Sequence, residues 1–346
     1  MTAEPGRTWP DDLPATQSRI VLRRRPEGLV TWDDVALETD APLPEVPDGY
    51  ALVRVEQLAM DATVRSWLNE GEGYMPAVEI GEVVRCAGIG RVVATRSDKF
   101  AVGDIASTLP GMQEYYAVTD DFLTTPQPAA TDMDAALAIY GATGITAYLG
   151  VVDIGAAKDG ETVVISAAAG ATGSIAGQIA KLMGCRVVGI AGTDDKCRFV
   201  VEELGFDAAI NYRTDDLGAA LKKHCPKRVD VYFDNVGGPV LDAVLGRIAD
   251  GARIVLCGAI SVYNDTHKPP GPSNYLNLIA RRARMEGFIA WDHWGRHDEI
   301  VGKLRGWVEA GQIHHVVHPY DGLDSAVEAL NALFIGANTG KVIVRV

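Results

Sequence analysis

The chain has 346 residues, of which 47% are hydrophobic and 23% charged, and its formal net charge is −14 at pH 7. This length predicts two domains, and the composition is that of a globular protein rather than a disordered or fibrous one. The acidic excess argues against nucleic acid or an anionic membrane as a partner, because both bind basic surfaces.

The cysteines and the N-terminal residues indicate the cellular compartment in which the protein is expected. The first residues lack the apolar core of a signal peptide, and no apolar run approaches the roughly 20 residues that span a bilayer. We therefore expect a cytoplasmic protein with reduced thiols, because its five cysteines are scattered, odd in number and without a close pair: Cys86, Cys185, Cys197, Cys225 and Cys257.

The first third of the chain has the pattern of short strands separated by turns. Its β-branched segments, bounded by Gly and Pro, predict an antiparallel, partly barrel-like sheet. At Met133 the pattern changes to an alanine-rich one that predicts a helix. The expected strands are residues 18–24, 50–58, 83–95 and 103–108.

From residue 162 the predicted strands and helices alternate, which indicates a parallel sheet with helices on both faces. A helix over 323–334 and a terminal strand over 341–346 follow, and we expect that strand to return to the first domain. The predicted domains are therefore 1–135 with 312–346, and 136–311. The expected strands of the second half are 162–166, 186–190, 208–210, 229–233, 252–257, 285–290 and 316–319.

A glycine-rich turn follows the strand at 162–166. Ala168-x-Gly170-x-x-Gly173, with Thr172 inside it, matches Gly-x-Gly-x-x-Gly with alanine at the first position. A strand before it and a helix after it make this pattern specific for a turn that holds a dinucleotide pyrophosphate on backbone N–H groups. Gly177, one helical turn later, predicts close packing of the helix on the strand.

The next strand indicates which dinucleotide binds. A carboxylate at its end would bind the ribose hydroxyls of NAD, but the residues there are Ala191-Gly192-Thr193. This end leaves room for a 2′-phosphate, to which Lys196 supplies positive charge and Tyr212 a hydrogen bond. The pattern favours NADP, although Asp194 and Asp195 are close by.

Two loops at later strand ends are candidates for the nicotinamide side. They begin at Asn235 and Cys257, and the second includes Ser261. Ligands of doubly wound sheets bind at the carboxyl ends of strands, which is where both loops lie in the predicted topology.

These residues resemble the zinc-independent branch of the medium-chain dehydrogenase/reductase superfamily, and within it the prostaglandin reductase, alkenal double-bond reductase and curcumin reductase group. The resemblance covers nearly the whole chain. Its motifs include Glu79-Ile80-Gly81-Glu82, Gly111-x-Gln113-Glu114-Tyr115, Asp234-Asn235-Val236-Gly237-Gly238, Cys257-Gly258-Ala259-Ile260-Ser261-x-Tyr263-Asn264, Met285-Glu286-Gly287-Phe288-Ile289 and Asn338-x-Gly340-Lys341.

The resemblance implies a GroES-like substrate domain, completed by the C-terminal strand, and a Rossmann domain that binds NADP, with the active site in the cleft between them. It implies that Lys196 and Tyr212 hold the 2′-phosphate, and that Phe288, Ile289 and Asn338 lie near the nicotinamide half. Relatives in this group are often dimers, so a homodimer is a further expectation.

The sequence offers no zinc site. Segment 76–83 has no His or Cys, the cysteines are too widely spaced for a cluster, and the histidines gather late in the chain, where surface positions are expected. Without a metal, we expect hydride to add to the β-carbon of an enone or enal while charge moves to the carbonyl oxygen.

Tyr263 is the candidate donor to that oxygen, or the proton source for the α-carbon. Tyr74, Met112, Tyr115 and Tyr275 are weaker candidates for the substrate pocket. Where many relatives have Asp-Pro-Tyr-Met-Arg and Gly-Trp-Gln-Glu-Tyr, this chain has residues 61–65 and 111–115 without that tyrosine and tryptophan. These departures leave the substrate open.

Two other functions stay open from the sequence. One is an NADPH quinone reductase of the same superfamily, against which the segments at 257–264 and 269–272 argue. The other is an NADPH-binding protein without turnover, against which the intact cofactor loops and Tyr263 argue.

Overall fold

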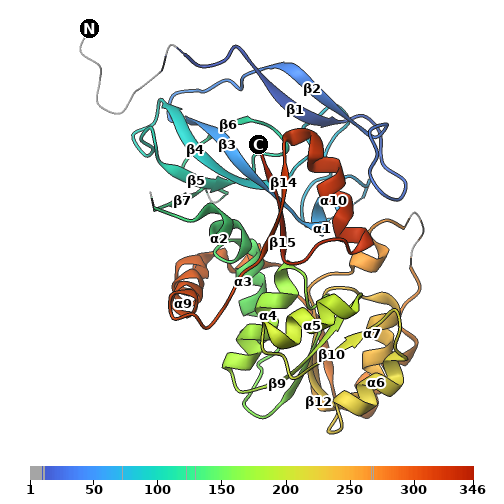
Figure 1. Ribbon diagram of the computed structural model, residues 1–346. Helices are drawn as coiled ribbons and strands as arrows, with labels where there is room; N and C mark the ends of the chain where they lie inside the picture. The colour runs from blue at the N-terminus through green and yellow to red at the C-terminus, as the bar shows by residue number, and fades with distance from the viewer. Residues whose placement is uncertain are drawn as a thin grey trace. The chain divides into compact units, whose positions relative to one another are not determined.

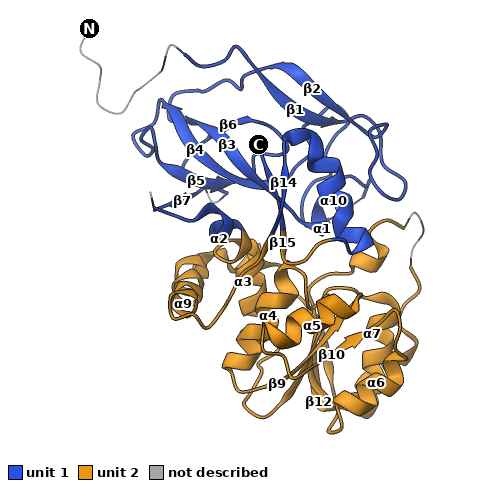
Figure 2. Cartoon of the chain, viewed as in Figure 1, with its two compact units in different colours: residues 1–137, 318–337, 342–346 blue, residues 138–317, 338–341 orange. Residues whose placement is uncertain are grey.

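Figure 1 shows a computed structural model of the chain, which describes residues 10, 12–71, 73–121, 123–128, 130–265, 267 and 269–346. Two units divide it, as coloured in Figure 2: residues 1–137, 318–337 and 342–346, and residues 138–317 and 338–341. Residues 312–317 and 338–341 thus fall in the second unit and residues 136–137 in the first, whereas the predicted division placed each of these segments in the other domain. Backbone hydrogen bonds explain the difference, since Gly340 N–H donates to Ala169 and Lys341 N–H to Val316, both at 2.8 Å.

The first unit is built on an antiparallel sheet around β3 (Ala51–Met60) and β4 (Ala87–Thr95). In the described residues the strand order is β14-β15-β3-β4-β5-β7, with β6 also paired to β3, and β1 and β2 form a separate hairpin. The other strands are β1 (Thr16–Leu22), β2 (Val35–Pro42), β5 (Ile105–Thr108), β6 (Tyr115–Val118), β7 (Thr125–Gln127), β14 (Val317–Asp321) and β15 (Lys341–Arg345).

The C-terminal strand completes this sheet. β15 runs antiparallel to β3, with Val342 opposite Met60 and Arg345 opposite Gln57, so the predicted return of the terminal strand is confirmed. Buried side chains of β3, β15 and α10 share one core. The helices of the unit are α1 (Ala62–Ser66), α2 (Met133–Ala138) and α10 (Ala326–Ile335), the last preceded by the 3-10 turn η5 (Leu323–Ser325).

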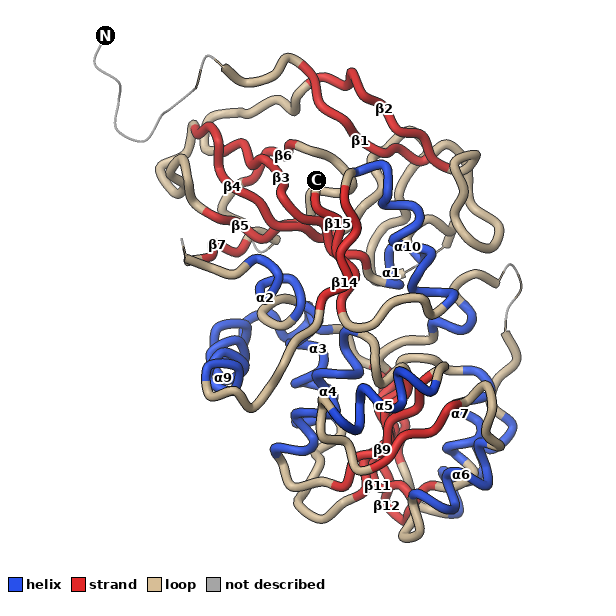
Figure 3. The backbone as a smooth tube through the Cα atoms, in the orientation of Figure 1, coloured by secondary structure: helices blue, strands red, loops and turns tan. Residues whose placement is uncertain are grey.

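The second unit contains a parallel sheet, as predicted, with the order β10-β9-β8-β11-β12-β13. Every residue of β8 is buried, which is typical of a strand covered on both faces. Helices lie along both faces (Figure 3). The strands are β8 (Thr162–Ser166), β9 (Arg186–Ala191), β10 (Ala208–Asn211), β11 (Val229–Asp234), β12 (Ile248–Leu256) and β13 (Arg284–Gly287).

Four helices connect these strands: α4 (Ala171–Leu182), α5 (Asp194–Glu202), α6 (Leu217–His224) and α7 (Gly238–Leu245). Further helical segments are α3 (Ala142–Tyr148), the π-helix η1 (Leu149–Ile154), η2 (Ile260–Val262), η3 (Ser273–Leu276), α8 (Asn277–Ala280), η4 (Ala290–Arg296) and α9 (His297–Glu309). Among the helices of the described residues, none is long and apolar enough to cross a bilayer.

Candidate cofactor and active site

The glycine-rich turn connects β8 to α4. Ala167 has φ +48°, and Gly170, in an extended conformation, is the N-cap residue of α4. A Cβ at Gly173 would stand 2.4 Å from the carbonyl oxygen of Ala167, so only glycine fits this close approach. Because Gly170 has no side chain to cap the helix, the first N–H groups of α4 are suited to an anionic ligand such as a pyrophosphate.

The adjacent ends of β9 and β10 carry the residues predicted for the 2′-phosphate. Thr193 caps α5, its Oγ1 accepting a hydrogen bond from the backbone N–H of Lys196 at 3.2 Å. Tyr212 N–H donates to Ala191, which brings the tyrosine beside Gly192; a Cβ at Gly192 would lie 3.2 Å from the Tyr212 hydroxyl. The structure therefore gathers these four predicted residues at one sheet edge.

Two features of this edge modify the prediction. Asp194 accepts a hydrogen bond from Asn211 Nδ2 at 2.7 Å, and Asp195 is ion-paired with Arg198, so both nearby carboxylates are bound. Arg213 was missed by sequence reasoning, although its position directly after Tyr212 was the available signal. Burial, and then the positive charge of Arg213, hold the pKa of Lys196 below its ordinary value.

Asp234, fully buried at the end of β11, organises the candidate nicotinamide loops. Its Oδ1 accepts hydrogen bonds from Ser166 Oγ (3.0 Å), Tyr232 OH (2.7 Å) and the N–H groups of residues 236 and 237 (both 3.0 Å). Its carbonyl oxygen accepts from Cys257 N–H and from Gly258 N–H. One residue thus ties together the ends of β8, β11 and β12, although the sequence offered it only as part of a motif.

These bonds bring together the predicted residues of the two loops. Asn235 Nδ2 donates to Ser166 O at 2.7 Å, and Ser261 Oγ to Val236 O at 2.6 Å. Burial, followed by the negative charge of Asp234, raises the pKa of Cys257 to about 12. That thiol therefore stays protonated at neutral pH. It is expected to contribute to the surface of the site and not to act as a nucleophile.

Tyr263 lies in the same loop as Ser261. Its hydroxyl oxygen accepts a hydrogen bond from Ala259 N–H at 3.0 Å, and a Cβ at Gly258 would lie 3.1 Å from it. This backbone bond orients the phenol at the carboxyl end of β12. A phenol held there is able to donate a hydrogen bond or pass on a proton.

Asn338, Phe288 and Ile289 lie elsewhere on the second unit. Asn338 is buried and its Nδ2 donates to Gly340 O, while Gly340 forms a bridge with Gly170, so this residue lies close to the glycine turn in the fold. Phe288 and Ile289 directly follow β13 and are half-buried, at the carboxyl end of the sheet.

The four residues predicted for the substrate pocket divide between the units. Met112 belongs to the core of the first unit, and Tyr115 packs beside Leu52 in a smaller cluster. Tyr74 is half-exposed, with its hydroxyl 2.5 Å from Thr63 Oγ1. In the second unit, Tyr275 is 54% exposed. Tyr74 and Tyr275 therefore offer aromatic surface to a ligand, whereas Met112 contributes to the core.

Comparisons with known proteins agree with this architecture. A family model described as the N-terminal domain of oxidoreductase matches residues 18–125, and one described as zinc-binding dehydrogenase matches residues 171–302. The chain is 39% identical to the NADPH-dependent curcumin reductase of Escherichia coli, over 95% of this chain and 96% of that one. It is 36% identical to the NADP⁺-dependent 2-alkenal reductase of Nicotiana tabacum, over 96% and 98% of the two chains.

The crystal structure of CurA from Vibrio vulnificus in complex with NADPH is similar throughout, with a TM-score of 0.90 and 38% identity over 95% of this chain and 98% of that one. The chain belongs to the medium-chain dehydrogenase/reductase superfamily. Within it, these relatives place the chain in the group of prostaglandin, alkenal and curcumin reductases, a group of NADP-dependent oxidoreductases.

The description of the second family model includes zinc, which requires three or four Cys, His or carboxylate ligands. Among the residues that the structure describes, no three His, Cys, Asp or Glu side chains are placed to hold a metal ion together. Within the described residues, no set of donors therefore fits a zinc centre.

Proposed function

We propose that this reductase uses NADPH to reduce the carbon–carbon double bond of α,β-unsaturated aldehydes and ketones. The observation that carries the proposal is the full-length similarity to the NADP-dependent curcumin and 2-alkenal reductases. Local geometry supports the choice of cofactor, because β9 ends without a carboxylate and Lys196 and Tyr212 lie at that end.

In the proposed mechanism, bound NADPH supplies the hydride that adds to the β-carbon of the substrate. The N-terminus of α4 binds the pyrophosphate, and Lys196 and Tyr212 bind the 2′-phosphate. Asp234, which is fully buried, holds the loops at Asn235 and Cys257 in place, so its proposed role is that of a positioning residue. Such fixed loops hold two reactants at reacting distance without an ordering cost during the reaction.

Tyr263 is the proposed catalytic residue. The backbone bond from Ala259 fixes its hydroxyl. From this position the phenol is proposed to donate to the oxygen on which negative charge develops, or to deliver the proton that the α-carbon takes up. A preorganised donor of this kind stabilises the charge of the transition state without a metal.

A spectrophotometric panel tests the proposal by following the oxidation of NADPH and NADH with four acceptors: an alkenal, a cyclic enone, a bulky diarylenone and a quinone. We expect NADPH to be consumed with at least one enone or enal, with a saturated product. Turnover of the quinone alone would contradict double-bond reduction, and preference for NADH would contradict the cofactor. Absence of turnover with every acceptor, despite NADPH binding, would favour a binding protein.

We also propose a small-molecule substrate as the reaction partner and the cytoplasm as the compartment. The five cysteines are all free, which suits a reducing environment.

A further inference from the structure

We propose that Arg213 is a second cation for the 2′-phosphate of the cofactor, acting beside Lys196 to set the preference for NADPH over NADH. This inference rests on the proposed function, because it requires a cofactor that carries a 2′-phosphate. It adds to Lys196 and Tyr212 a residue whose position is determined by the turn after β10.

Asn211 fixes that turn. Its side chain is buried, its Oδ1 accepts a hydrogen bond from Arg213 N–H at 3.1 Å, and its Nδ2 donates to Asp194 Oδ1 at 2.7 Å. Because one side chain binds both segments, the turn that carries Tyr212 and Arg213 is held against the first turn of α5. That turn of α5 also carries Lys196.

The Arg213 side chain lies over the neighbouring aromatic ring. Its Cζ is 5.8 Å from the centre of the Tyr212 ring, a cation–π arrangement that limits where the guanidinium can go. The ring is 43% exposed and borders Gly192, so the guanidinium lies at the edge of the predicted 2′-phosphate site and not in the core.

The positive charge of Arg213 affects the protonation of Lys196. After burial, the charge of Arg213 is the second cause that lowers the pKa of Lys196, which agrees with the Asn211 bonds that hold the two segments together. A dianion between like charges relieves such repulsion and gains from both. A guanidinium suits this task, because its planar set of donors binds two phosphate oxygens at once.

Three carboxylates near this site have hydrogen-bond or ion-pair partners at the same sheet edge. Asp194 is bound to the Asn211 amide, Asp195 is paired with Arg198, and Asp215 Oδ2 accepts the backbone N–H of Asn211. Each of these three carboxylates therefore has a partner. Asp195 is paired with a cation, whereas Asp194 and Asp215 are bound by neutral donors and keep their negative charge. A second cation beside Lys196 therefore offsets their repulsion of a phosphate.

Calorimetric titration of the full-length protein with adenosine 2′,5′-bisphosphate and with AMP tests this role without turnover. For Arg213→Gln we expect about tenfold weaker binding of the bisphosphate, the lower range for a charge-assisted hydrogen bond, and a change of less than about twofold for AMP. Arg282→Gln is the matched control, since it removes the same charge from an exposed position just before β13, at the opposite edge of the sheet from β9 and β10, and it should bind both ligands as the wild type does. Added salt should narrow the difference between wild type and Arg213→Gln.

The outcomes separate the two proposals. If Arg213→Gln binds the bisphosphate as the wild type does while Lys196→Gln loses affinity, the role of Arg213 is overturned and the cofactor assignment stands. If the wild type itself does not prefer the bisphosphate to AMP, both are overturned. Equal losses for the bisphosphate and AMP would show that Arg213 supports the adenosine site as a whole, and would also overturn its role at the phosphate. Arg213→Lys, which keeps the charge but loses the planar fork, should bind with intermediate affinity.

Discussion

At the scale of single residues, the carboxyl edge of the parallel sheet combines residues that hold loops in place with residues whose hydroxyl groups could contact a ligand. Asp234 and Asn211 are buried and hold loops through backbone groups, whereas Tyr212 and Tyr263 present hydroxyls at that edge. Asn211 fixes the turn that carries Tyr212, and the Ala259 N–H fixes the Tyr263 hydroxyl. The proposed catalytic and binding roles therefore belong to different side chains from the structural ones. Substitutions should affect activity and stability separately.

Tyr263→Phe tests the proposed donor. Loss of one preorganised hydrogen-bond donor should lower kcat for an enone by roughly 10–100-fold. The KM for NADPH should change little, because the hydroxyl is assigned to the substrate oxygen or α-carbon and not to the cofactor. Steady-state kinetics of the variant provide the measurement.

Tyr50→Phe, in a packed cluster of the first unit, is a matched control that should keep wild-type kcat. An unchanged kcat in Tyr263→Phe would remove Tyr263 from the mechanism.

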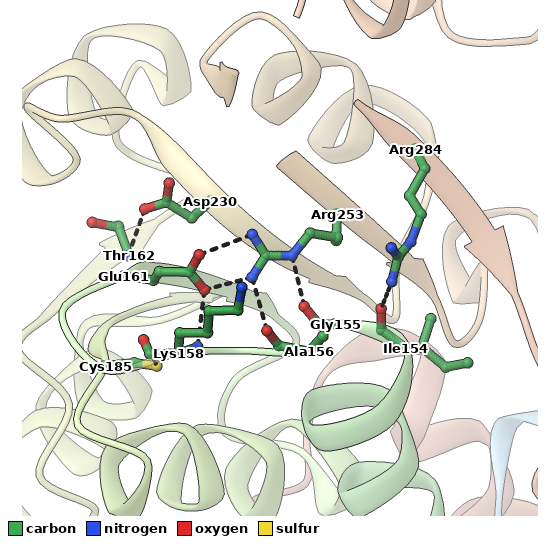
Figure 4. Close-up of polar contacts among 10 residues, drawn as sticks. All are labelled: Ile154, Gly155, Ala156, Lys158, Glu161, Thr162, Cys185, Asp230, Arg253 and Arg284. Atoms are coloured by element: carbon green, nitrogen blue, oxygen red, sulfur yellow. Dashed lines mark hydrogen bonds and ion pairs between the residues drawn. The ribbon is translucent and has the colours of Figure 1, made fainter. Parts of the chain in front are cut away.

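At the scale of elements, hydrogen bonds from Arg253 hold the segment between η1 and β8 against β12, as Figure 4 shows. Arg253 on β12 donates from Nε to Gly155 O and from Nη2 to Ala156 O, and its two Nη atoms also bind the carboxylate of Glu161. These bonds satisfy carbonyl groups at the end of a helical segment. They also fix the start of β8, whose other end leads into the glycine turn.

Glu161→Gln should make the pH dependence of stability smaller. Burial would raise the pKa of Glu161, but the hydrogen bonds from Arg253 and from the N–H of Lys158 hold it below the ordinary value of 4.5. A lowered pKa means that this carboxylate stabilises the fold above about pH 4.5 and loses that effect as the pH falls through its folded-state pKa.

The wild type should exceed Glu161→Gln by about 1–2 kcal/mol in free energy of unfolding near pH 7, the range for a partly exposed charged hydrogen bond. This difference in free energy of unfolding should decrease toward pH 3, and urea titrations at several pH values would measure it. Glu202→Gln, on the exposed side of α5, is the control. A gap that did not depend on pH would contradict the ionic role of Glu161.

At the scale of the whole molecule, the parallel sheet has an edge at β13, which pairs with β12 and, among the described strands, with no other. The segment before it exposes three large apolar side chains: Tyr275 (54%), Leu276 (58%) and Ile279 (75%). An edge strand with an adjacent apolar surface is suited to pairing with a second copy about a twofold axis.

We therefore predict a homodimer, with light scattering after gel filtration giving twice the mass of one chain at micromolar concentration. Ile279→Asp should shift the population toward the monomer, because it places a charge in an apolar interface. Val201→Asp, on an exposed part of α5, should not. A monomeric wild type would contradict the prediction.

Much of the second unit could be predicted from the sequence because its strands are short apolar segments bounded by turns. Residues 162–166 coincide with β8, whereas 252–257 falls short of β12, which begins at Ile248. β2 and the π-helix η1 were not predicted: β2 exposes much of its length, and a π-helix lacks a distinct residue pattern. Gly177 packs close as predicted, but a Cβ there would stand 1.8 Å from the Phe206 ring and not against a strand.

The sequence by itself determined the order of the elements, the glycine turn and the missing carboxylate after β9, because each depends on neighbouring residues in the chain. Only the tertiary structure decided which distant groups meet. Asp234 receives donors from β8 and from its own loop, and Asn211 joins two segments to place Arg213. Contacts of this kind depend on strand order and on side-chain direction at the sheet edge, and neither is encoded in a local pattern. The glycine turn predicts a dinucleotide, and its neighbours in space determine how the phosphates are to be recognised.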